Sequence, residues 1–188
     1  ATGNEKLNTG DQIRLFLSDE TFSKFSQQEQ TARAVTDLDI IYEDTDILLI
    51  NKPAGMLSQP DDTKEPSMVE YLIGYLLQNG SLTEENLRTF HPSVCNRLDK
   101  NTSGVIAAGK SLAGLQELST LFHDRTVHKD YLCIVKGKLT RSRHIRGYLH
   151  KDANLNKVSV SPTKEKDAQP IETQYTPICN NEHATLLK

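Results

Sequence analysis

The chain has 188 residues, of which 36% are hydrophobic and 25% charged, and its formal net charge is -3. This composition is typical of a globular protein, and no apolar stretch approaches the roughly 20 residues of a membrane-spanning helix, so we expect no membrane partner. Three widely separated cysteines form neither a CxxC pair nor a metal-ligand spacing, which favours a reduced, cytoplasmic setting over a disulfide framework.

Charge is distributed unevenly along the chain. Residues 1–62 contain 12 acidic and 5 basic side chains, whereas residues 125–151 contain 8 basic side chains and a single acid, Asp130. A polyanion responds to such a local excess rather than to the net charge. The basic stretch is interleaved with aromatic and imidazole side chains, namely Tyr131, His144, Tyr148 and His150. Two interpretations follow: a solvated charged surface, or a surface whose rings stack on RNA bases beside phosphate contacts.

The first predicted strands alternate with polar segments. Residues 1–36 are polar and contain one alternating run, residues 11–17, which predicts a short edge strand. Two apolar runs, residues 39–44 and 46–53, predict a strand, a tight turn and a second strand. The second strand is expected to end at Pro53, because proline cannot donate a hydrogen bond to a sheet.

Two helices are predicted from their caps and their periodicity. Ser67 and Glu70 form a capping box that predicts a helix over residues 68–78. Ser111 can cap a second helix over residues 112–124. The apolar side chains that recur at helical spacing, and that we expect to face the core, are Leu72, Tyr75, Leu76, Leu112, Leu115, Leu118 and Phe122.

Short strands dominate the rest of the chain. They are predicted over residues 105–109, 130–139, 157–161, 171–178 and 184–188. From the alternation alone, Tyr131 is a core tyrosine of the second of these strands. The pattern favours an α+β fold, with a mixed, largely antiparallel sheet and flanking helices.

The stretch CNRLDKNTSGV, residues 95–105, permits two interpretations of Asp99. Aspartate is a common turn residue, because its carboxylate accepts hydrogen bonds from nearby backbone N–H groups. Arg97 and Lys100, however, place this carboxylate in a positive local field, which favours the ionised form that a nucleophile requires. These residues alone favour the turn and leave the catalytic interpretation open.

Residues 91–111, HPSVCNRLDKNTSGVIAAGKS, resemble the central motif of the RluA-type pseudouridine synthases, R-L-D-x-x-T-S-G followed by a short apolar run and a lysine. Four further stretches agree in order and spacing. Residues 40–60 resemble the K-P-x-G motif, residues 124–137 the K-x-Y motif, residues 144–160 an insertion of many bacterial members, and residues 4–17 the link to a small N-terminal RNA-binding domain. Each motif alone is weak, but the ordered set is specific.

The resemblance implies isomerisation of uridine to pseudouridine in RNA, above all ribosomal large-subunit RNA, after the target nucleotide is flipped out of its stack. It implies no cofactor, no metal and a monomer. Asp99 falls on the catalytic aspartate, a nucleophile or base, and Arg97 on an arginine that fills the space left by the flipped uridine. Tyr131 falls on a tyrosine that packs against the target base and is a candidate for proton transfer. The remaining expected RNA-binding positions are Lys52, which has a structural role as its alternative, and Asn101, Thr102 and Lys129.

The resemblance also sets the expected domain limits. Residues 1–36 are expected to be a linker and remnant after an N-terminal RNA-binding domain, and residues 37–188 a catalytic domain truncated at its C-terminus. A later family motif, T-G-R-x-H-Q-I-R, supplies an arginine partner for the catalytic aspartate and is expected beyond Lys188, so we expect the 188-residue fragment alone to be inactive. Two alternatives stay open: a non-catalytic RNA-binding or RNA-chaperone module on the same fold, and an unrelated hydrolase with an aspartate nucleophile.

Overall fold

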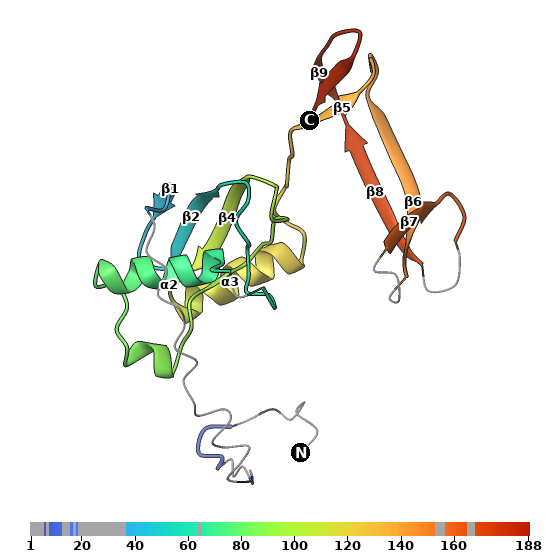
Figure 1. Ribbon diagram of the computed structural model, residues 1–188. Helices are drawn as coiled ribbons and strands as arrows, with labels where there is room; N and C mark the ends of the chain where they lie inside the picture. The colour runs from blue at the N-terminus through green and yellow to red at the C-terminus, as the bar shows by residue number, and fades with distance from the viewer. Residues whose placement is uncertain are drawn as a thin grey trace. The chain divides into compact units, whose positions relative to one another are not determined.

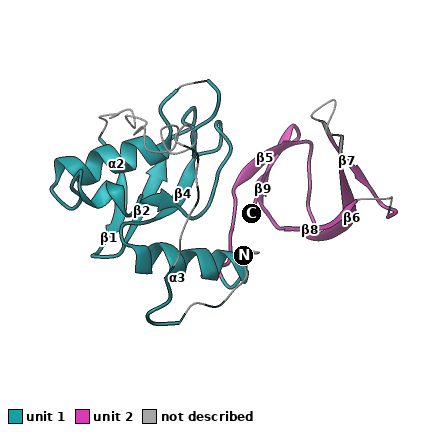
Figure 2. Ribbon diagram, turned by 90° about the horizontal axis from the view of Figure 1, so that it is seen from below, with its two compact units in different colours: residues 1–126 teal, residues 127–188 magenta. Residues whose placement is uncertain are grey.

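The structure, a computed structural model, describes residues 37–63, 65–152, 157–164 and 168–188, together with residues 6, 8–12, 16 and 18. The chain forms two compact units, residues 1–126 and 127–188 (Figures 1 and 2). Most of the strand predicted over residues 11–17 lies outside the described residues. No helix of the described part is long and apolar enough to cross a membrane.

An antiparallel sheet of four strands organises the first unit, in the order β1-β2-β4-β3. Its strands are β1 (Ile40–Glu43), β2 (Ile47–Lys52), β3 (Ser93–Val94) and β4 (Gly104–Gly109). The predicted turn between the first two strands is confirmed, since the Asp44 carboxylate accepts hydrogen bonds from the backbone N–H groups of Asp46 and Ile47, both at 2.8 Å. The pairing of β2 with β4 places Lys52 opposite Gly104, so both lie at one end of the sheet.

Helix α2 (Met68–Gln78) covers one face of this sheet (Figure 2). The predicted capping box is present: the Ser67 backbone N–H donates to the Glu70 carboxylate at 2.8 Å, and the Ser67 hydroxyl accepts from the Val69 N–H at 3.2 Å. Apolar side chains of α2 pack with those of the sheet in a core whose fully buried members include Leu48, Ile50, Met68, Leu72 and Ile106. A three-residue 3-10 helix, Asn86–Arg88, follows.

Helix α3 (Leu112–His123) lies against the opposite face of the sheet (Figure 2). Its predicted cap is confirmed, because the Ser111 hydroxyl accepts from the Gly114 N–H at 3.1 Å. The predicted apolar stripe is wrong at one end: Leu118 is buried, but Leu112 is 56% exposed. The helix approaches the sheet through Gly114, where an added Cβ would stand 2.2 Å from the Asp46 carbonyl oxygen, and this close approach turns Leu112 outward.

The second unit consists of two antiparallel sheets, with the strand orders β5-β10-β9 and β7-β6-β8. Its strands are β5 (Cys133–Lys136), β6 (Arg143–Asp152), β7 (Lys157–Ser161), β8 (Gln169–Tyr175), β9 (Pro177–Asn180) and β10 (Ala184–Leu187). The described residues contain two α-helices and three antiparallel sheets, so the α+β class is confirmed.

Two strand predictions in this unit were wrong. Tyr131 lies before β5 and is 51% exposed, so it is not a core residue of a strand. Strand β5 begins at Cys133, which pairs with Leu187 of β10. The run 171–178 divides into β8 and β9 at Thr176, whose N–H and C=O both pair with the backbone of Lys188.

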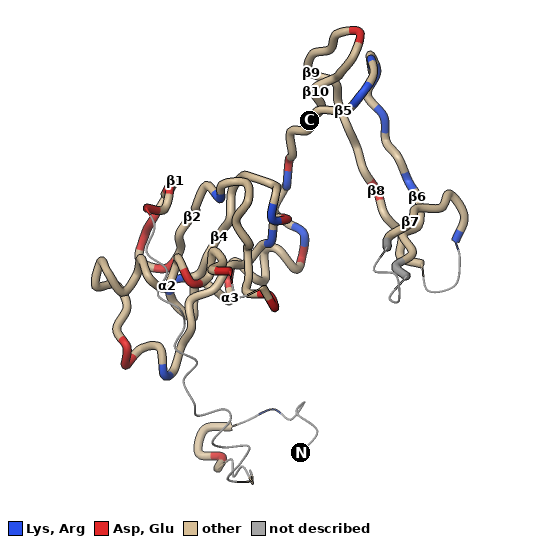
Figure 3. The backbone as a smooth tube through the Cα atoms, viewed as in Figure 1, with Lys and Arg blue, Asp and Glu red and all other residues tan. Residues whose placement is uncertain are grey.

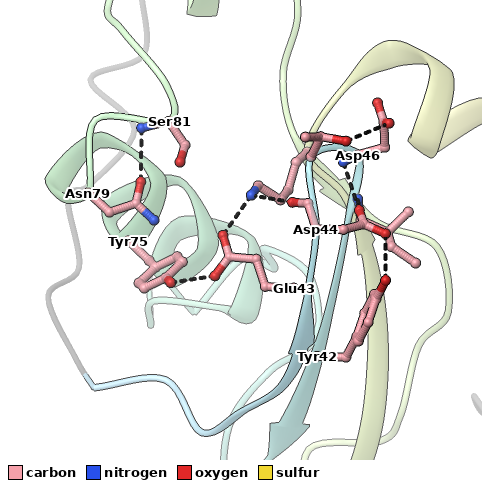
Figure 4. A network of polar contacts seen from close by, with 10 residues as sticks. Tyr42, Glu43, Asp44, Asp46, Tyr75, Asn79 and Ser81 are labelled. Carbon is pink, nitrogen blue, oxygen red and sulfur yellow. Dashed lines mark hydrogen bonds and ion pairs between the residues drawn. The ribbon is translucent and has the colours of Figure 1, made fainter.

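A polar network joins the hairpin of β1 and β2 to both helices (Figure 4). The Lys110 ammonium donates to the Glu43 carboxylate at 2.6 Å and to the Asp44 carbonyl at 2.7 Å. The Tyr75 hydroxyl donates to the other oxygen of Glu43 at 2.6 Å. Partial burial alone would raise the pKa of Glu43, but the hydrogen bonds from Lys110 and Tyr75 lower it below the ordinary glutamate value.

This network predicts a pH-dependent contribution to stability. Because the folded-state pKa of Glu43 is lowered, its contribution is fully present above the unfolded-state pKa and is lost as pH falls through the folded-state value. We expect Glu43→Gln to reduce the free energy of unfolding at pH 7 by about 1 kcal/mol, and by less near pH 3. Urea unfolding at both pH values measures this, with the exposed Glu117→Gln as the matched control. Equal losses at the two pH values would contradict the assignment.

Candidate functional site

The loop that contains Asp99 connects β3 to β4, and its first residues are attached to β4. The Cys95 backbone N–H donates to the Ala107 carbonyl at 2.7 Å. The Asn96 amide donates to the Val105 carbonyl at 3.0 Å and accepts from the Ala107 N–H at 2.8 Å. Asn96 therefore extends the hydrogen bonding of the sheet into the loop.

A second attachment lies directly before Asp99. The buried Ser58 hydroxyl donates to the Leu98 carbonyl at 2.6 Å and accepts from the Leu98 N–H at 3.0 Å. The Leu98 side chain packs against the core. Because both the backbone and the side chain of Leu98 are held, the next residue in the loop has a defined position.

Asp99 itself is exposed. The Thr102 N–H donates at 2.9 Å to the main-chain carbonyl of Asp99, so the backbone closes this turn. The carboxylate forms no hydrogen bond or ion pair with the described residues. Gly104 ends the loop with a φ of 134°, a conformation that favours glycine. The turn predicted from the sequence is present, and it leaves the carboxylate available.

Lys52 is fully buried beneath this turn. Its ammonium donates to the carbonyls of Pro53, Met56 and Lys100, at 3.0, 2.8 and 3.2 Å. The Lys100 carbonyl also accepts from the Gly55 N–H at 2.7 Å. Lys52 thus connects the loop after β2 to the turn that begins at Asp99.

Burial is also the main influence on the charge of Lys52. Desolvation lowers the pKa of Lys52 below the ordinary lysine value, and the negative charge of Asp99 acts in the opposite direction. Of the two roles considered from the sequence, RNA contact and structural support, burial favours support, because the ammonium is enclosed by main-chain carbonyls.

The other predicted site residues divide between the two units. Arg97 and Asn101 are exposed and Thr102 is half-buried, and all three share the loop of Asp99. Lys129 and Tyr131 belong to the second unit, on the segment that leads into β5. The structure thus gathers the residues of the R-L-D-x-x-T-S-G motif, with Lys52, in one unit.

Sequence reasoning missed three residues that define this loop. Ser58 and Asn96 hold its backbone, and Glu65 forms an ion pair with Lys100 at 2.6 Å. The Lys100 ammonium is therefore paired with the Glu65 carboxylate rather than with that of Asp99. Lys100 thus adds less to the positive field at Asp99 than its position in the sequence suggested. Ser58 and Glu65 are far from Asp99 in the chain, and no local pattern identifies them.

A cavity of about 330 Å³ lies beside β2, and its lining includes Asp37, Asp39, Lys52 and Ser103. Asp99 is outside that lining, and two carboxylates disfavour a phosphate there, so we assign the cavity no part in the site. Within the described residues, no group of three or more His, Cys, Asp or Glu side chains could hold a metal ion.

Comparison with known proteins places these features in a family. The model of a family described as RNA pseudouridylate synthase matches residues 46–188. Ribosomal large subunit pseudouridine synthase D of Borreliella burgdorferi is 31% identical over 185 residues, covering 92% of this chain and 54% of that protein. An uncharacterized RNA pseudouridine synthase of Mycoplasma genitalium, MG370, is 30% identical, covering 92% of this chain and 53% of the relative.

Solved structures agree at the level of the fold. The human RNA pseudouridylate synthase domain containing 1 aligns with a TM-score of 0.61 at 17% identity, covering 82% of this chain and 59% of that one. The chain spans about half the length of the curated relatives it matches. The match over most of its length shows that the chain belongs to the RNA pseudouridylate synthase family.

Proposed function

We propose that the protein containing this chain isomerises uridine to pseudouridine in RNA, and that its substrate is ribosomal large-subunit RNA. Family membership supports the reaction. The names of the relatives in Borreliella burgdorferi and Nitrosomonas europaea, both ribosomal large subunit pseudouridine synthase D, support the substrate. The proposed domain limits are a linker over residues 1–36 and a catalytic domain from residue 37 onward.

The main support for the proposal is that Asp99 is held in position while its carboxylate is left unengaged. Its carboxylate is exposed and unengaged within the described residues, while the backbone on both sides of it is held by hydrogen bonds. A reactive group that is already positioned loses little freedom when substrate binds, which favours reaction. A merely structural turn aspartate would use its carboxylate to close the turn.

The proposed reaction is redox-neutral, because the product is an isomer of the substrate. The bond between ribose C1′ and uracil N1 breaks, the base rotates, and a bond between C1′ and C5 forms. The hydrogen at C5 leaves as a proton, and N1 gains one. Asp99 acts in this sequence as a nucleophile on the ribose or the ring, or as the base that removes a proton.

The nucleotide must leave its stack before Asp99 can reach it, at a cost of a few kcal/mol. Arg97 is exposed two residues before Asp99, and its planar guanidinium is suited to stack in the vacated space. In the same proposal Tyr131 packs against the uracil and exchanges a proton, and Asn101, Thr102 and Lys129 contact RNA. Lys52 does not contact RNA in this proposal; it holds the turn that positions Asp99.

The first test uses RNA labelled with tritium at uracil C5, because formation of the new bond releases that hydrogen. We expect Asp99→Ala to slow tritium release from ribosomal RNA by at least about 100-fold, which is the lower range for removal of an acid–base group. The matched control, Asp62→Ala, removes an exposed carboxylate of the same unit and should react normally.

Equal release by wild type and Asp99→Ala would refute the role of Asp99. RNA affinity without release by the complete wild-type protein would favour the alternative, a non-catalytic RNA-binding module.

The two roles of Tyr131 can be separated by two variants. Tyr131→Phe keeps the ring and removes the phenol, so we expect RNA affinity to persist while kcat falls by about 100-fold. Tyr131→Leu removes the ring as well and should also weaken binding. Single-turnover kinetics and RNA titration measure the two quantities. Full activity of Tyr131→Phe would exclude proton transfer by this residue.

A further inference from the structure

Strand β6 has two chemically different faces. Successive side chains of a strand point to opposite faces of the sheet, so alternate residues share one. The side chains that share one face, which we call the β6 polar face, are those of His144, Arg146, Tyr148 and His150. Basic residues recur along β6 in Figure 3. Of the two arginines in β6, Arg146 lies on this face and Arg143 lies on the opposite one.

The neighbouring strands extend this division across the sheet. Directly paired residues of antiparallel strands share a face. Partners on the polar face are Ser159 and Ser161 of β7, and Pro170, Glu172 and Gln174 of β8. On the other face lie the apolar side chains of Ile145, Leu149, Val158, Val160 and Ile171, together with those of Arg143, Gln169, Thr173 and Tyr175. The aliphatic side chains of these strands therefore gather on the face opposite the β6 polar face.

Glu172 orients two groups of the polar face. Its carboxylate accepts from the Arg146 Nε at 3.0 Å and pairs with the His144 Nε2. The hydrogen bond from Arg146 is the main cause that lowers the pKa of Glu172 below its ordinary value. Arg146 is 77% exposed at its side chain, and its two terminal nitrogens have no partner in the described part of the chain. These nitrogens are free to bind an anion.

We propose that the β6 polar face binds a single-stranded segment of the RNA substrate, as a contact surface additional to the loop of Asp99. The inference rests on the proposed function for the identity of the RNA. A guanidinium matches a phosphate, a phenol and imidazoles stack on bases, and serine and glutamine side chains bind sugar or phosphate oxygens. Side chains on one face of a strand repeat every ~7 Å, which suits an extended chain of nucleotides better than a compact ligand.

The distribution of apolar side chains favours RNA over a protein partner on this face. The exposed large hydrophobic residues of this sheet, Ile145, Val158 and Val160, all lie on the opposite face. A protein interface has an apolar centre, and the polar face offers none among its described residues. The carboxylate of Glu172 on this face is already paired with two basic groups.

The test compares matched changes on the two faces of the sheet. Arg146→Gln and Tyr148→Leu alter the polar face, while Arg143→Gln and Tyr175→Leu make the same changes on the opposite face, where these two residues pair. All are made in the complete protein with Asp99→Asn, so that a labelled single-stranded RNA can be titrated without turnover.

We expect Tyr148→Leu to weaken RNA binding at least about fivefold, and Tyr148→Phe, which keeps the ring, to bind normally. Arg146→Gln should reduce the slope of log affinity against log salt by about 0.7, as for one lost phosphate contact. The opposite-face variants should change neither quantity. Because the Arg146 side chain is exposed, we expect Arg146→Gln to fold normally. A change in its salt slope then reports the loss of an RNA contact.

Equal RNA affinity and equal salt slopes for Arg146→Gln and Arg143→Gln would overturn the inference. The proposed function is judged separately, by pseudouridine formation in the protein with Asp99 intact. Product formation together with unchanged affinity in the polar-face variants rejects the inference alone. A selective loss of RNA binding in these variants, in a protein that forms no product, supports the inference and rejects the proposed reaction.

Discussion

The buried ammonium of Lys52 is the interaction on which the geometry of the Asp99 loop depends. It donates to three main-chain carbonyls from two segments, and one of them, that of Lys100, belongs to the turn that begins at Asp99. A buried charge is costly unless its hydrogen bonds are satisfied. Here the carbonyls satisfy the ammonium, and the ammonium holds the segments together. The pairing of Lys52 with Gly104 places this arrangement where the loop joins the sheet.

The two units contribute different parts of the proposed reaction. The first unit supplies the carboxylate of Asp99 and the guanidinium of Arg97, on a loop held by Ser58 and Asn96. The second unit supplies Tyr131 and the β6 polar face, within the part of the sequence that is richest in basic residues. In this proposal an anionic substrate is attracted mainly by the second unit, while the carboxylate proposed to react belongs to the first.

Local signals in the sequence predicted the fold well where their causes are also local. The Asp44 turn and the caps at Ser67 and Ser111 each involve residues within four positions, and all three are present. The exposure of Leu112 depends instead on the contact of Gly114 with Asp46 across the chain. At the site, the motif identified the loop of Asp99, but not the bonds between Ser58 and Leu98, which lie 40 residues apart. Such partners are set by tertiary packing.

Amide hydrogen exchange of the Gly55, Leu98 and Thr102 N–H groups tests most directly whether Lys52 holds this loop. We expect slow exchange in the wild-type protein and markedly faster exchange in Lys52→Met, because the carbonyls that the ammonium binds lose their donor. Lys100→Met keeps the main-chain carbonyl and removes only the exposed pair with Glu65, so its exchange should match wild type. Fast exchange of these amides in the wild type, or equal exchange in wild type and Lys52→Met, would contradict the account.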